Sequence, residues 1–295
     1  MVSVVPGSSV EGCPFAALVR GRSTAGLTLS VLALSATSAW ATPASPYASE
    51  VVSYVQGSGV GREFNVPANA LGEPSRSTGE RSNFFSAVTP FNPAFESDEL
   101  VSVGRAGELV VRFAEPITND PLNPFGIDLL VFGNSGYVDV DFPNARAGGL
   151  FGGGDGGVIS VSSDGVSWSV VPSLQADGAF PTLGYLDLPS AYGLPGSVPS
   201  DFTRPVDPAF DPLGKTFAEI VTGYAGSGGG VGVDIGSLGL SEISFVRVSN
   251  ASDAVAVPEI DGFADVAPIP APSVASVGLV VACTVWRRRR VMRKS

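Results

Sequence analysis

The sequence predicts an all-β domain built from short strands and many turns. Of its 295 residues, 37 are glycine and 24 are proline, and only 15% are charged. Glycine and proline at this frequency favour turns over helices. The clearest local pattern is Val158–Val171, in which two short alternating runs flank Asp164-Gly165. Because both turn residues tolerate positive φ, this pattern predicts a tight β-hairpin.

The predicted hairpin supplies apolar side chains to a core. We expect Val158, Val161 and Val166 to face that core from one side of the pleat. Trp168 follows the turn and is expected to fill the core as one large apolar body. A binding surface is then expected in the loops at the end of the sandwich, not on the hairpin.

Four runs before the hairpin predict further strands. Glu50–Val55 alternates weakly, and Leu100–Val103 and Gly107–Phe113 are short apolar runs around a glycine-containing turn. Ile127–Phe132 is apolar almost throughout. Since a strand of this kind is buried on both faces, it is predicted to lie at the centre of a sheet.

Three elements are predicted after the hairpin. Thr216–Tyr224 has the pattern of a short helix, Glu242–Ser249 alternates as a strand, and Val257–Val266 forms the last strand. Because no internal repeat and no linker divides residues 42–266, we expect a single domain there.

Long irregular segments connect these strands. Tyr192–Leu213 is rich in proline and is expected to cross the surface, and Gly148–Gly157 contains seven glycines and is expected to be a mobile loop. The region 57–98 carries four phenylalanines. Loop aromatics form platforms for sugar rings or plug the ends of a sandwich, and the sequence leaves both interpretations open. These residues are Phe84, Phe85, Phe91 and Phe95.

The predicted domain is strongly acidic. Residues 42–266 contain nine Lys and Arg against 27 Asp and Glu, a net charge of −18. Such a field repels nucleic acid and attracts cations. The chain has no histidine, which excludes a Ser-His-Asp triad and a histidine zinc site. Cys13 and Cys283 both fall in terminal segments, so the domain contains no thiol and no disulfide.

The N-terminal segment resembles a signal peptide. Arg20 and Arg22 precede an uncharged, mostly apolar run over 25–36, and Ala39-Trp40-Ala41 has the small-x-small form of a signal-peptidase site. We therefore expect residues 1–41 to be a signal peptide cleaved after Ala41, and the mature chain to be exported.

The C-terminal segment, residues 267–295, has three parts. A Pro-x-Pro motif, Pro270-Ala271-Pro272, is followed by a short apolar run and four consecutive arginines. The run has about fourteen residues, fewer than the roughly 20 that span a bilayer comfortably. This tail resembles the PEP-CTERM sorting signal of bacterial exported proteins, although the motif lacks the glutamate. The resemblance implies an exosortase-type processing enzyme, transient anchoring in the membrane through the tail, and delivery to the cell surface or extracellular matrix.

The pieces of the domain, taken in order, resemble the discoidin-like branch of the galactose-binding-like jelly rolls. The matching segments are the turn Asn69–Pro74, the strand Gly107–Phe113, the hairpin Ser162–Trp168, the strand Phe245–Val248 and the closing Pro258–Ile260. The resemblance implies a jelly-roll β-sandwich with long loops rich in glycine and proline.

The same resemblance implies a structural calcium ion where the N-terminal turn meets a glutamate on the last strand. Glu259 matches that glutamate, Glu73 is a possible side-chain ligand, and the turn beginning at Asn69 would supply mainly backbone oxygens. Leu71 stands where the family has an aspartate. Calcium binds about six to eight oxygens and accepts backbone carbonyls, so one missing carboxylate does not exclude it.

Together these features predict a non-catalytic surface or matrix protein whose jelly roll binds glycan. One alternative is an extracellular hydrolase with paired carboxylates, and another is a structural coat component without a ligand. The sequence does not bring any two carboxylates to a working separation. The candidate carboxylates for a hydrolase are Asp120, Asp128, Asp155 and Asp234.

Overall fold

The structure is a computed structural model that describes residues 44–268. The predicted signal peptide with Ala41, and the predicted sorting motif of Pro270, Ala271 and Pro272, lie outside these residues. Among the described residues, no helix is long and apolar enough to cross a membrane.

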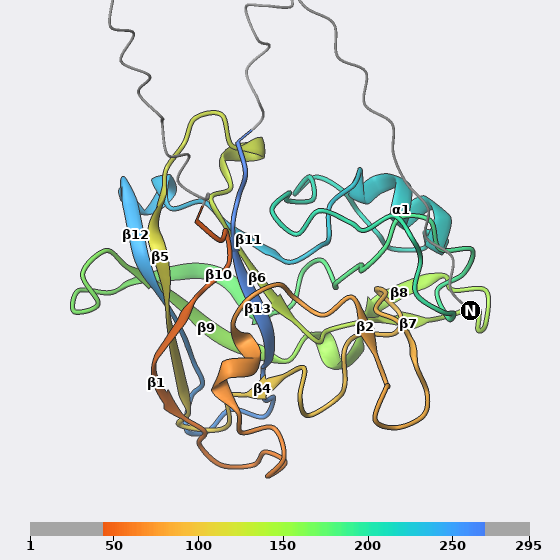
Figure 1. Cartoon of the computed structure of the whole chain (residues 1–295), viewed down its shortest axis with the longest axis horizontal. Helices are drawn as coiled ribbons and strands as arrows, with labels where there is room; N and C mark the ends of the chain where they lie inside the picture. The colour runs from red at the N-terminus through yellow and green to blue at the C-terminus, as the bar shows by residue number, and fades with distance from the viewer. Residues whose placement is uncertain (1–43, 269–295) are drawn as a thin grey trace, which may run out of the picture. The chain divides into compact units, whose positions relative to one another are not determined.

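Two antiparallel sheets form a β-sandwich, as the sequence predicts (Figure 1). The first sheet has the strand order β1-β5-β12-β9-β10 and the second has the order β11-β6-β13-β4. The first consists of β1 (Glu50–Val55), β5 (Glu108–Thr118), β12 (Glu242–Ser249), β9 (Gly156–Ser162) and β10 (Ser169–Asp177). The second consists of β11 (Val231–Val233), β6 (Leu129–Gly133), β13 (Glu259–Asp265) and β4 (Val101–Ser102).

Shorter elements lie beside the sandwich (Figure 1). They are the ribbon of β2 (Ser77–Thr78) and β3 (Ser86–Ala87), the ribbon of β7 (Tyr137–Asp139) and β8 (Ala147–Leu150), and the helix α1 (Phe217–Tyr224). Four 3-10 turns complete the described chain: η1 (Pro67–Ala70), η2 (Pro124–Gly126), η3 (Phe151–Gly153) and η4 (Gly236–Leu238).

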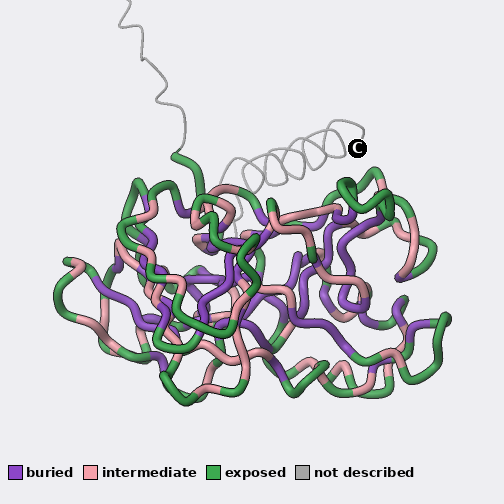
Figure 2. The backbone as a smooth tube through the Cα atoms, turned by 90° about the horizontal axis from the view of Figure 1, so that it is seen from below, coloured by how far each residue is buried: buried purple, intermediate pink, exposed green. Residues whose placement is uncertain are grey.

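The main core lies between the two sheets, and buried segments run through the interior in Figure 2. Alternate residues of each strand face inward because side chains alternate across a pleated sheet. Leu109 and Val111 of β5 and Val246 of β12 meet Leu129 and Val131 of β6 there, and all five are fully buried.

Strand β6 is central and covered on both faces, which confirms the prediction for this run. It pairs with β11 on one side and β13 on the other. The opposite face of β6 carries Leu130 and Phe132, which pack in a second cluster with Phe202. The rings of Phe132 and Phe202 have centroids 5.2 Å apart in an edge-to-face arrangement. The segment after Ser200 therefore forms a layer outside the sandwich.

The predicted hairpin forms, but its turn is wider than predicted. Strands β9 and β10 pair antiparallel, with Val161 opposite Ser169. Of the two turn residues only Gly165 has positive φ, at 74°. The Asp164 carboxylate accepts the N–H groups of Val166 and Ser167 at 2.8 and 2.7 Å. The tight-turn prediction was wrong because aspartate stabilises a longer loop through its side chain.

The predicted orientation of the hairpin side chains was wrong for three of four residues. Val161 is fully buried, but Val158 is 44% exposed and Val166 is 81% exposed. Val158 and Val161 are three residues apart, so a period of two places them on opposite faces. Trp168 is half-buried outside the main core, where the Arg247 guanidinium lies 4.4 Å from the centroid of its ring.

Helix α1 begins where the sequence predicts it. The Thr216 side chain caps the helix and exchanges hydrogen bonds with Glu219 in a capping box. The apolar face of α1 carries Phe217, Ile220 and Tyr224, which pack in a cluster separate from the main core. The expected mobile loop over 148–157 is in part regular structure, because its two ends belong to β8 and β9.

Candidate functional site

The four loop phenylalanines do not act as one group. Phe91 is buried in the cluster around α1, where its ring lies edge-to-face with those of Tyr137 and Phe217. Phe84, Phe85 and Phe95 are 66%, 46% and 37% exposed. Phe91 is therefore a packing residue of the α1 cluster, outside the sandwich core, while the other three present apolar surface at the β2–β3 ribbon.

A pocket with a volume of about 630 Å³ opens beside η2, and we call it the Asp201 pocket. Four parts of the chain form it: the η2 turn, the surface segment 201–207, the C-terminal end of α1 and residues 267–268. Its size is in the range of typical small-molecule sites. Its walls include Phe125, Asp201, Arg204, Asp207 and Tyr224.

Polar groups in the Asp201 pocket keep part of their hydrogen-bonding capacity. One oxygen of Asp201, Oδ1, accepts the N–H of Thr203 at 2.9 Å and its hydroxyl at 2.7 Å. One oxygen of Asp207 accepts the N–H of Ala209 at 2.8 Å. Within residues 44–268 the second oxygen of each carboxylate has no partner, and the Arg204 guanidinium forms no ion pair. Phe125 adds a ring that is 55% exposed.

The backbone holds the Asp201 side of the pocket in place. The N–H of Asp201 donates to the carbonyl of Gly226 at 2.9 Å, and its carbonyl accepts the N–H of Gly228 at 2.8 Å. The next residue, Phe202, is buried against the sandwich, with the Arg76 guanidinium 4.2 Å from its ring centroid. Because the segment is fixed in this way, the pocket does not have to form at the moment of binding.

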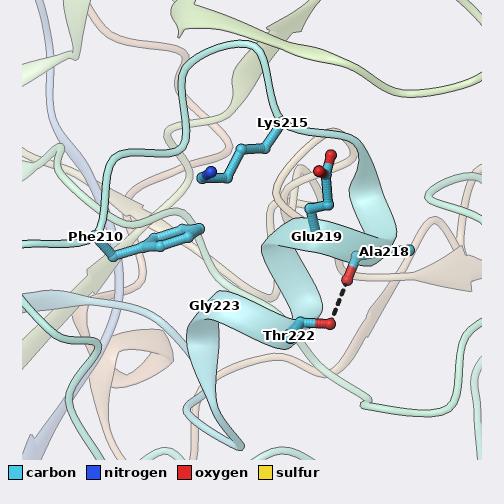
Figure 3. Close-up of a pocket in the computed structure, with 6 residues that line it drawn as sticks. All are labelled: Phe210, Lys215, Ala218, Glu219, Thr222 and Gly223. Carbon is cyan, nitrogen blue, oxygen red and sulfur yellow. Dashed lines mark hydrogen bonds between the residues drawn. The ribbon is translucent and has the colours of Figure 1, made fainter.

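A second pocket, with a volume of about 420 Å³, shares Gly223 with the Asp201 pocket (Figure 3). Lys215 extends over Phe210, with Nζ 5.7 Å from the ring centroid. A Cβ at Gly223 would lie 2.0 Å from Phe210 Cε2, so glycine allows the ring to pack on the helix. The Glu219 carboxylate accepts the hydroxyl and N–H of Thr216. Phe210 packs on α1 and Glu219 belongs to its capping box, so both side chains already stabilise the helix. The Asp201 pocket is therefore the better candidate for a ligand site.

The chain matches no family model and no curated protein. Function therefore has to be inferred from the residues of these sites.

The predicted calcium ligands have separate hydrogen-bond partners. The Asn69 amide donates to the carbonyls of Ser97 and Leu100 at 2.9 and 3.1 Å. Glu73 forms an ion pair with Arg76. Glu259 accepts the Ser102 hydroxyl at 3.0 Å on Oε1.

Glu259 also accepts the Asn134 amide on Oε2. The side-chain carbonyl of Asn134 is buried without a partner in the described chain, so it is a second oxygen suited to a cation beside this carboxylate. Among residues 44–268, no three His, Cys, Asp or Glu side chains are grouped to hold a metal. A calcium ion at Glu259 would therefore take its remaining ligands from carbonyl oxygens and water.

The N-terminal turn does meet the last strand, but at a carboxylate that the sequence did not single out. Asp261 is 2% exposed and accepts the N–H and the hydroxyl of Ser75, both at 2.9 Å. Gly262 lies against Pro74 of the same turn. Burial, and to a smaller extent the charge of Glu99, raises the pKa of Asp261 to about 7.

A second buried carboxylate, Asp177, lies beside Glu259 at the end of β10. Its oxygens accept the N–H groups of Ser135 at 2.7 Å and Glu259 at 3.1 Å. Burial raises its pKa to about 7, against these two hydrogen bonds and with help from the nearby charges of Asp155 and Glu259. Asp261 and Asp177 lie in the strands β13 and β10. An aspartate within such a strand was the sequence feature that could have identified each of these buried carboxylates.

Three of the four carboxylates considered for a hydrolase lie at the η2 end of the sandwich. Burial raises the pKa of the Asp128 carboxyl; the Asp120 backbone lowers it and the charge of Asp234 raises it further, so both residues lie near Asp128. Asp128 is fully buried, so a polymer substrate cannot contact it. Asp155 lies elsewhere, beside Asp177. Phe125 and Arg204 of the Asp201 pocket could not be selected from the sequence, because segments distant in the chain bring them together.

Proposed function

We propose that the protein is a non-catalytic, exported surface or matrix protein whose β-sandwich binds glycan at the Asp201 pocket. The observation that supports this most is the combination of an exposed ring, Phe125, with the unpaired oxygens of Asp201 and Asp207 in one pre-formed pocket. A sugar ring needs an apolar surface for its C–H face and acceptors for its hydroxyl groups. Charged acceptors form the stronger of these hydrogen bonds.

The charge of the domain favours a neutral or amino-bearing glycan. The pocket lining carries two negative charges, on Asp201 and Asp207, and one positive charge, on Arg204. Residues 42–266 as a whole carry a net charge of −18. A polymer of uronic acids would meet repulsion both at long range and at the pocket. Neutral polysaccharide and partly de-N-acetylated aminoglycan are therefore the proposed ligand classes.

Binding of purified protein to immobilised polysaccharides tests the proposal. The panel contains a neutral glucan, a partly de-N-acetylated glucosamine polymer and a polyuronate. We expect Phe125→Ala to weaken binding by about tenfold or more, equivalent to about 1.4 kcal/mol. Phe151→Ala is the matched control, because Phe151 is a 72% exposed ring that does not line the pocket.

Two outcomes would contradict the proposal. One is the absence of binding to every polymer in the panel. The other is binding that Phe151→Ala weakens as much as Phe125→Ala, since a general apolar surface would then be responsible.

We also propose the finer features that the sequence implies. The sandwich is proposed to be a discoidin-like jelly roll with a structural calcium at Glu259. The terminal segments are proposed to direct export and sorting through an exosortase-type enzyme, with the membrane contacted only through the tail. Mass spectrometry of protein from its native cell tests this through the two mature termini: an N-terminus at residue 42 supports export, and an uncleaved residue 1 contradicts it.

A further inference from the structure

The η2 end of the sandwich buries oxygen atoms that only accept hydrogen bonds. Asp128 is fully buried, and its carboxylate accepts the Asn123 amide on Oδ1 at 2.8 Å and the N–H of Ile235 on Oδ2 at 3.1 Å. It forms no ion pair with a basic side chain of residues 44–268. A buried carboxylate with neutral donors alone is expensive to keep ionised.

A second carboxylate adds to the negative charge. Asp265 lies at the end of β13, opposite Leu129, and the N–H of the following Val266 donates to the Asp128 carbonyl at 3.0 Å. Asp265 is partly buried. The charge of Asp128 acts on the Asp265 carboxyl, so the two side chains lie near each other. The two strands therefore bring like charges together without a cation from the described chain.

Asn123 provides separate evidence for a ligand near Asp128, because its side-chain carbonyl oxygen has no hydrogen-bond partner in the described chain. Asn123 is only 6% exposed, and its Oδ1 is buried without any hydrogen-bond partner in the described chain. Its amide nitrogen is the group bonded to Asp128, so the carbonyl of the same amide lies next to that carboxylate. A buried amide oxygen without a donor is destabilising unless a group outside the described chain satisfies it.

We propose that Asp128, Asp265 and the side-chain carbonyl of Asn123 bind one calcium ion. Each contributes an oxygen, which is the ligand atom that calcium prefers, and calcium accepts mixed carboxylate and carbonyl ligands in irregular geometry. Magnesium fits less well, since it requires near-octahedral geometry and retains several waters. The net negative charge of the domain also attracts a calcium ion at long range.

This site is distinct from the calcium site implied at Glu259 and does not rest on glycan binding. Its position nevertheless connects the two, because Asn123 directly precedes Pro124 and Phe125 of the Asp201 pocket. The N–H of Asn123 donates to the Asp120 carbonyl at 2.9 Å, which places its amide within the same turn. Calcium at Asn123 would therefore fix the turn that presents the Phe125 ring.

Calorimetric titration of the purified, chelator-treated chain with calcium chloride, without glycan, tests the site. The Asp128→Asn variant keeps the shape of the side chain and removes its charge, and Asp265→Asn is a second variant at a less buried position. We expect each to weaken calcium binding by about tenfold or more. Calcium at a hundredfold excess over Kd should raise the Tm of the unsubstituted chain by about 5–10 °C.

Asp261→Asn is the matched control, since Asp261 is also a buried carboxylate that accepts neutral donors alone and belongs to neither calcium site. Loss of affinity in Asp128→Asn that exceeds the loss in Asp261→Asn supports the proposal. Unchanged calcium affinity in a folded Asp128→Asn or Asp265→Asn variant overturns it. It is equally overturned if the unsubstituted chain binds no calcium, because a water molecule would then satisfy Asn123.

Discussion

Replacing Asp261 with asparagine should stabilise the protein at alkaline pH and leave its stability unchanged in acid. Asp261 is buried where the N-terminal turn crosses β13, and Ser75 supplies both of its hydrogen bonds. Asparagine can keep both. Its carbonyl accepts the N–H of Ser75, and its amide donates to the Ser75 hydroxyl, which rotates to accept. The variant therefore removes the charge without leaving a donor or acceptor unpaired.

The magnitude follows from the pKa of Asp261, which burial raises from 3.8 to about 7 in the folded state. Because the folded pKa is the higher one, the folded protein holds the proton between these two values while the unfolded chain releases it. Stability is therefore greatest below about pH 4 and falls as the pH rises towards 7. At 1.36 kcal/mol for each tenfold change in dissociation constant, the upper limit of this loss is about 4 kcal/mol.

Urea unfolding at several pH values measures the effect. We expect equal midpoints for the two proteins near pH 4, and a variant more stable by up to about 4 kcal/mol near pH 8, with an unchanged m value. Asp253→Asn, at an exposed position, controls for the change in net charge. The reasoning is refuted if the stability difference between Asp261→Asn and the unsubstituted protein does not grow from pH 4 to pH 8.

Two further predictions concern packing and capping, and thermal unfolding measures both. Phe132→Ala should destabilise the fold by about 3–5 kcal/mol because the ring is fully buried against Phe202; a loss below about 1 kcal/mol would show that the outer layer is not tightly packed. Thr216→Ala should cost about 1 kcal/mol, or about 2–4 °C in Tm, by removing the capping box of α1; a Tm equal to that of Ser49→Ala, an exposed control outside helices, would contradict this.

Strand positions followed from the sequence where local pattern and tertiary packing agree. β1 and β12 have the predicted bounds, and the apolar run at β6 lies at the centre of its sheet. A strand that is buried on one face has alternating apolar residues, and one buried on both faces is apolar throughout. Either pattern can be recognised within a short segment of sequence. Thr216 and Glu219 are likewise a local signal, since a capping box acts within one turn.

The face of the sheet on which each hairpin side chain lies could not be predicted from the local sequence pattern. Trp168 follows a loop whose length Asp164 sets by accepting two backbone N–H groups, and one residue of difference in loop length reverses the face of every later side chain. The ring then packs on Arg247, which belongs to a strand about 80 residues later in the chain.

The sequence by itself determined the fold class, the net negative charge of residues 42–266 and the exclusion of histidine chemistry, because these depend on composition and on short-range periodicity. Tertiary structure alone decided where the functional groups meet. The Asp201 pocket combines η2, the segment 201–207, α1 and residues 267–268, and Asp128 and Asp261 become buried only when other strands and turns cover them. Burial and proximity arise from contacts distant in sequence, and they are the quantities that shift a pKa and create a site.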